Sequence, residues 1–144
     1  MAADGWPDHV ETVVLPSGRR VHARGLGRSV APDPPPEFGV YLLGRRPADV
    51  AWAHEWIRWP DFRLPADRPA ALASLRRALE RSGSERVEIA FRCGRGRTGT
   101  ALAVMAVADG VAPAAAVEWV RRAHDRRSVE TPWQRRWIAS LPAS

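Results

Sequence analysis

One segment constrains the fold more than any other. Between residues 85 and 110, an apolar strand candidate, a loop of glycine and arginine, and an apolar helix candidate follow one another. ERVEIAF (85–91) predicts the strand, and TALAVMAVADG (100–110) predicts a buried helix that Gly110 ends. Because the strand is apolar on both sides near its end, we expect it in the middle of a mixed or parallel sheet, with helices over both faces.

The other elements follow from periodicity and from the placement of proline and glycine. Strands first and helices later predict an α/β fold of one domain, residues 1–144. Its first part, 1–37, holds a β-hairpin and a proline-rich connector, and 38–144 forms the core. Further strands are expected at 38–44 and 53–59. Helices are expected at 66–83 (with Asp67 as its cap), 112–124 and 131–141.

Composition narrows the class of protein. The single cysteine, Cys93, excludes an internal disulfide, and the four histidines lack metal-ligand spacing, so no metal or cofactor is expected. The longest apolar run is too short to cross a membrane, and the start of the chain has no signal-peptide pattern, which predicts a cytoplasmic location. The net charge of +6 comes entirely from arginine, which suits phosphate, acidic ligands or nucleic acid, or reflects a GC-rich genome.

The glycine and arginine loop is an anion-site candidate for a physical reason. A strand that leads through such a loop into a helix brings backbone N–H groups together at the positive end of the helix dipole. Glycines let the backbone approach an anion closely, and Arg97 can pair with two phosphate oxygens at once. The alternative is a glycine-rich turn that binds nothing.

The letters of this loop, GRGRTGT, resemble the second half of the signature Cys-x5-Arg-Ser/Thr-Gly of the cysteine-dependent protein tyrosine and dual-specificity phosphatases. The resemblance implies a tyrosine-phosphatase-like fold, similar to short bacterial phosphatase-like proteins in which an N-terminal hairpin precedes the core. It also implies a phosphate-binding role for a run of seven residues. These are Arg92, Cys93, Gly94, Arg95, Gly96, Arg97 and Thr98.

The signature departs from the family at its most important position. Six residues before Arg97, where the family has its nucleophilic cysteine, this chain has Phe91, which has no nucleophilic atom. Cys93 lies only four residues before Arg97, and the three residues between them are too few to encircle a phosphate. We therefore expect phosphatase chemistry to be absent or vestigial. Cys93 is otherwise a small loop thiol, or a reactive thiolate favoured by its arginine neighbours.

Two further segments resemble the family. Trp59-Pro60-Asp61 stands after a strand candidate and thirty residues before position 91, where the family has a mobile loop with a general acid, so the resemblance gives that role to Asp61. The alternative is an ordinary turn, as at Trp6-Pro7-Asp8. The segment 130–134 resembles one whose polar groups position water and form the wall of the site. Glu130 and Gln134 are the candidates, unless the segment simply starts a helix.

Three functions remain open on the sequence. The first is a degenerate phosphatase that binds a phosphorylated protein or another phosphoryl ligand. The second is an active phosphomonoester hydrolase that uses Cys93 in an atypical loop. The third is a basic nucleic-acid-binding domain, against which the absence of a recognised nucleic-acid motif argues.

Overall fold

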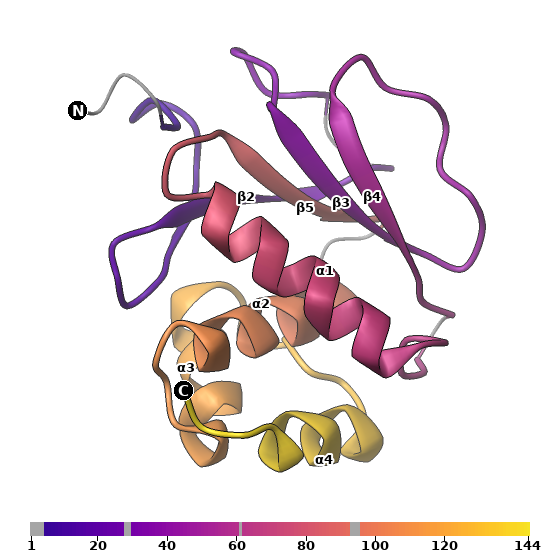
Figure 1. Cartoon of the computed structure of the whole chain (residues 1–144), viewed down its shortest axis with the longest axis vertical. Coiled ribbons are helices and arrows are strands. Elements are labelled where there is room, and N and C mark those ends of the chain that lie inside the picture. Colours follow the sequence, from indigo (N-terminus) through magenta and orange to yellow (C-terminus); the bar gives the residue numbers. More distant parts are fainter. Residues whose placement is uncertain (1–4, 28–29, 61, 93–95) are drawn as a thin grey trace.

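The computed structural model describes residues 5–27, 30–60, 62–92 and 96–144. Its sheet has five strands in the order β1-β2-β5-β3-β4. The hairpin strands β1 (Val13–Val14) and β2 (Arg20–Gly25) pair antiparallel, and all other neighbours pair parallel. These other strands are β3 (Phe38–Leu43), β4 (Ala53–Arg58) and β5 (Val87–Phe91). The expected α/β class, the mixed sheet and the central place of β5 are confirmed (Figure 1).

The helices are α1 (Arg68–Arg81), α2 (Gly96–Ala108), α3 (Ala116–Ala123) and α4 (Pro132–Ser140). The amide of Ala70 donates to the Asp67 carboxylate at 3.0 Å, so the expected cap of α1 is confirmed. The buried residues of α1 recur at helical spacing and face the sheet. They are Ala71, Ser74, Leu75, Ala78 and Leu79. Along the described part of α2, nearly every residue is buried, because this helix lies between β5 and the other three helices.

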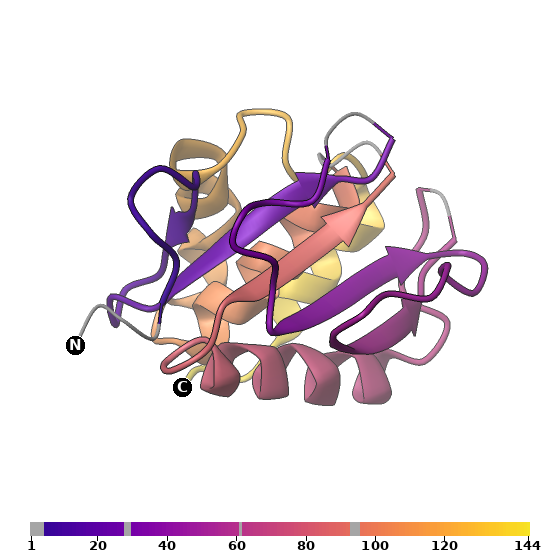
Figure 2. The ribbon, with the colours of Figure 1, turned by 90° about the horizontal axis from the view of Figure 1, so that it is seen from above.

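The expectation of helices on both faces of the sheet is wrong. Figures 1 and 2 show the four helices on one side, and the main apolar cluster joins their side chains to alternate strand residues such as Val40 and Ile89. In the described parts of connections 26–37 and 44–52, which lead into β3 and β4, there is no helix. These two connections, together with the N-terminal segment, leave the second face without a helical layer.

A buried polar network lies on that second face. Arg24 donates two hydrogen bonds to Glu88, at 2.7 and 2.9 Å, and Tyr41 donates to the same carboxylate at 2.8 Å. Trp52 in turn donates to the Tyr41 hydroxyl at 2.7 Å. Glu88 is fully buried, and its partners satisfy its charge. Burial raises the pKa of Tyr41, and the negative charge of Glu88 adds to the rise.

Gly39 is required by the way Tyr41 reaches this network. The Tyr41 ring folds back over the strand, so a Cβ at residue 39 would lie 2.7 Å from Tyr41 Cζ.

In the described residues, no helix is both long enough and apolar enough to span a bilayer.

Candidate functional site

The carboxyl ends of the four parallel strands meet at one edge of the sheet, and the candidate residues lie there. β5 ends at Phe91, and α2 starts at Gly96, four residues before the predicted helix start at Thr100. Part of the predicted loop is therefore the first turn of the helix. Of the predicted phosphate-binding residues, Cys93, Gly94 and Arg95 lie outside the described residues.

Arg97 stands in the first turn of α2 and is almost completely buried, with 6% of its surface exposed. Its Nη1 donates a hydrogen bond to the carbonyl of Trp59 at the end of β4. Its guanidinium carbon lies 3.4 Å from the centroid of the Phe91 ring, a cation–π contact at short range. Arg97 therefore joins the end of β4 to the end of β5.

Phe91, the last residue of β5, contacts Arg97. Its half-buried ring is stacked against the guanidinium of Arg97, the group that is predicted to bind the anion. The two side chains line the same pocket. A phenyl ring provides no atom that can attack phosphorus. The position six residues before Arg97 is thus filled by a chemically inert group in contact with Arg97.

Two buried hydroxyl groups occur at the same end of α2. Thr98 Oγ1 and Ser128 Oγ have no hydrogen-bond partner among the described residues, although both side chains are completely buried. Ser128 belongs to the loop between α3 and α4, which Arg121 holds by donating to the carbonyls of Ser128 and Val129 at 2.9 and 3.0 Å. Thr98 is predicted to bind phosphate, and it lies beside Arg97 in sequence.

Gly99 allows this loop to approach α2 closely. A Cβ added at residue 99 would lie 2.7 Å from the Cα of Ser128, closer than packed atoms tolerate. The glycine of the Arg-Thr-Gly triplet therefore has a packing role that the anion-loop interpretation did not include.

The segment after β4, which contains the general-acid candidate, is closed by backbone bonds. Ala66 N–H donates to the carbonyl of Arg58 at 2.9 Å, and Arg63 N–H donates to that of Pro60 at 3.2 Å. Trp59 is buried in the core, and its indole N–H donates to the carbonyl of Arg63 at 2.7 Å. Asp61 itself lies outside the described residues.

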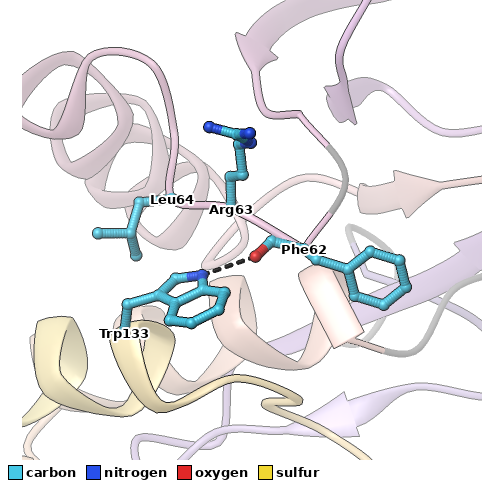
Figure 3. Close-up of a pocket in the computed structure, with 4 residues that line it drawn as sticks. All are labelled: Phe62, Arg63, Leu64 and Trp133. Atoms are coloured by element: carbon cyan, nitrogen blue, oxygen red, sulfur yellow. Dashed lines mark hydrogen bonds between the residues drawn. The ribbon is translucent and has the colours of Figure 1, made fainter.

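Helix α4 holds the same segment from the other side. Figure 3 shows the Trp133 indole N–H donating to the carbonyl of Phe62, at 2.6 Å, while the Phe62 ring points away from the indole. Phe62 has a positive φ of 56°, and 62% of its surface is exposed. A surface pocket of about 700 Å³ lies here, lined by Phe62, Arg63, Leu64 and Trp133.

The two water-positioning candidates differ in their surroundings. Gln134 is 1% exposed, and its Oε1 accepts the amides of Glu130 and Thr131 at 3.1 and 3.3 Å. Its Nε2 donates to the carbonyl of Arg63 at 3.2 Å. With Thr131 it forms the capping box of α4, so the helix-start interpretation of this segment is confirmed. Glu130 is exposed.

A pocket of about 520 Å³ opens at this edge of the sheet, and we refer to it as the arginine pocket. Its lining comes from the ends of β3, β4 and β5 and from the start of α2. The residues are Leu43, Gly44, Arg45, Arg46, Pro47, Ala48, Pro60, Phe91, Arg92 and Arg97. No aspartate or glutamate is among these described lining residues, and three of the four arginines (Arg45, Arg46 and Arg92) are exposed to a ligand that enters the pocket.

Two of these arginines, Arg45 and Arg46, were not among the residues predicted to bind an anion. Arg45 and Arg46 directly follow β3, and the carboxyl ends of neighbouring parallel strands lie at the same edge. The sequence contained a signal for them. The basic pair follows the strand candidate at 38–44, and Arg92 follows the strand candidate at 85–91. Trp133, which donates to the carbonyl of Phe62 in the segment after β4, was not among the candidate site residues.

In the described parts of the chain, no three His, Cys, Asp or Glu side chains gather in a way that could hold a metal ion. No protein-family model matches this chain, and a search of curated proteins found none with significant similarity to it.

Proposed function

We propose that this protein binds a phosphoryl anion in the arginine pocket and does not hydrolyse it. One observation carries the proposal: Arg97, buried at the start of α2, and three further arginines line one pocket with no described carboxylate in its wall. Guanidinium groups suit phosphate because their planar forks match two oxygens at once. The start of α2 adds the positive end of a helix dipole.

The lack of turnover follows from the chemistry of Phe91. In the family that the loop resembles, attack on phosphorus comes from the side chain six residues before the arginine. Here that side chain is a hydrocarbon ring stacked 3.4 Å from the Arg97 guanidinium. Arginine can stabilise a phosphoryl group electrostatically without a nucleophile, so we expect binding without catalysis.

The ligand class is a phosphorylated protein or a small phosphoryl compound. Both present a phosphomonoester with about −1.5 to −2 charges at neutral pH, which a cluster of guanidinium groups complements. The arginine pocket, at about 520 Å³, is larger than a phosphate group alone, so part of the attached molecule also fits inside.

Two measurements on the purified chain test the proposal. Calorimetric titration with inorganic phosphate and phenyl phosphate is expected to show binding, and Arg97→Lys is expected to weaken it about tenfold because a point charge replaces a bidentate fork. Arg76→Lys, on the exposed face of α1, is the matched control. Thermal melting of each variant shows whether the fold is retained.

The second measurement is hydrolysis of an aryl phosphate between pH 5 and 7. The wild-type protein is expected to be inert. Turnover that Cys93→Ser abolishes would establish the active-phosphatase alternative. Salt-dependent binding of DNA or RNA, with no response to phosphate, would establish the nucleic-acid alternative instead.

A further inference from the structure

The arginine pocket carries more positive charge than one phosphoryl group needs. Arg92 and Arg97 come from the end of β5 and the start of α2, while Arg45 and Arg46 come from the connection after β3. Three of these arginines, Arg45, Arg46 and Arg92, are exposed and carry three positive charges, whereas one phosphomonoester supplies about −1.5 to −2. A single phosphate therefore leaves at least about one of these three charges unbalanced.

The three exposed arginines of the pocket differ in their surroundings from other arginines of the chain. Elsewhere, arginines are paired: Arg24 with Glu88 at 2.7 Å and Arg77 with Glu55 at 2.7 Å. Among the described residues, Arg45, Arg46 and Arg92 have no such ion pair, and their side chains are exposed at the pocket. Like charges that lie close together without counter-charges repel one another, so a bound polyanion lowers the electrostatic free energy of these arginines.

The size of the pocket agrees with its charge. A volume of about 520 Å³ lies within the range of small-molecule sites and exceeds what one tetrahedral anion fills. The arginines also come from two chain segments that lie on neighbouring strands, β3 and β5. Two anionic groups joined by a short spacer can therefore contact both segments at once.

We propose that the ligand of the arginine pocket carries two or more phosphoryl groups. This inference rests on the function proposed above. One phosphoryl group binds at Arg97 and Arg92, beside the start of α2, and a second binds at Arg45 and Arg46. The ligand is a compound such as a diphosphate, a polyphosphorylated polyol or the headgroup of a polyphosphorylated lipid.

Calorimetric titrations at constant ionic strength test this proposal, with inorganic phosphate, pyrophosphate and tripolyphosphate as probes. Pyrophosphate is expected to bind at least about tenfold more tightly than phosphate, because each added charge-assisted contact favours the complex. The double variant Arg45→Ala/Arg46→Ala is expected to remove most of this preference while weakening phosphate binding less. Arg135→Ala/Arg136→Ala, an exposed pair on α4, changes net charge equally and serves as the control.

The outcomes separate this inference from the proposed function. If phosphate and pyrophosphate bind equally well, the inference fails and phosphate binding stands. If neither binds, both fail. If the α4 pair lowers pyrophosphate affinity as much as the pocket pair does, the preference comes from net charge alone, and the inference again fails.

One further arm identifies the source of the phosphoryl groups. Sedimentation is measured with phosphatidylcholine vesicles that contain a bisphosphorylated phosphoinositide. Binding to these vesicles that the pocket double variant abolishes points to a lipid headgroup. Binding to free tripolyphosphate only points to a soluble ligand. Equal binding to plain phosphatidylcholine vesicles counts against the pocket as the cause.

Discussion

The guanidinium carbon of Arg97 lies 3.4 Å from the centroid of the Phe91 ring, and both side chains line the arginine pocket. The contact is a cation–π interaction in which an aromatic face stabilises a mostly desolvated charge, worth up to about 2 kcal/mol. Phe91 thus contacts the guanidinium of Arg97 and supplies no nucleophile.

Phe91→Cys is expected to give the protein aryl phosphatase activity. In the family that the loop resembles, the side chain at this position attacks phosphorus. The nearby Arg97 favours the thiolate form of the new cysteine. We expect hydrolysis of an aryl phosphate to rise at least about 100-fold above the wild-type background, measured from pH 5 to 7.

Phe91→Ser is the control for that gain, because it removes the ring but supplies a poor nucleophile. Thermal melting follows the loss of the ring contact in both variants. If Phe91→Cys binds phosphate and remains inert, residue 91 and Arg97 do not stand in the geometry that the loop resemblance implies.

Gly99→Ala is expected to destabilise the fold by about 1–3 kcal/mol, since the added methyl group would overlap with the Ser128 backbone. Replacing glycine with alanine inside a helix usually raises stability, so a loss of stability here would indicate the overlap with Ser128. Urea unfolding measures it. At Gly44, where an added Cβ has its nearest neighbour at 3.7 Å, alanine is expected to change stability by less than about 0.5 kcal/mol. Equal stabilities for the two variants would contradict the close packing.

Glu88→Leu is expected to cost about 3–5 kcal/mol, because it leaves the Arg24 guanidinium buried without its counter-charge. The double variant Arg24→Met/Glu88→Leu removes both charges and is expected to recover most of that loss. A double-mutant cycle from urea unfolding gives the coupling energy. Purely additive losses would show that the two side chains do not stabilise each other.

Much of the fold follows from local pattern. The strands at Phe38–Leu43 and Val87–Phe91 and the helix at Arg68–Arg81 were predicted within a few residues, because apolar periodicity and the Asp67 cap are encoded locally. The start of α2 was missed. Gly96 and Arg97 are not strong start signals, and the contact of Arg97 with Phe91 in the first turn of the helix is a tertiary one.

The one-sided arrangement of the helices could not be predicted from β5 alone. Glu88 was an isolated carboxylate in an apolar strand, and its partners Arg24 and Tyr41 are 64 and 47 residues away in sequence. Only the register of β2 and β3 against β5 brings them together. At the site, spacing alone related Phe91 to Arg97, whereas the contribution of Arg45 and Arg46 depended on which strands are neighbours.

Glu55 provides a prediction for the pH dependence of stability. Hydrogen bonds from Arg77 are the main cause that lowers the pKa of Glu55; partial burial opposes them, and a bond from Ser74 assists them. A carboxyl group with a lower pKa in the folded state stabilises the protein above its unfolded pKa, about 4.5, and this contribution is lost as pH falls through the folded pKa. Glu55→Gln is therefore expected to be less stable than wild type at pH 7.

The difference between wild type and Glu55→Gln is expected to shrink steadily as pH falls below about 4.5, because protonation of Glu55 removes the charge that the substitution removes. Its size at pH 7 is expected to stay near or below 1 kcal/mol, since Arg77 is largely exposed and solvent screens the pair. Urea unfolding at several pH values, with Glu118→Gln as a matched exposed pair with Arg122, measures it. A stability difference that does not change with pH would show that Glu55 acts through packing and neutral hydrogen bonds rather than through its charge.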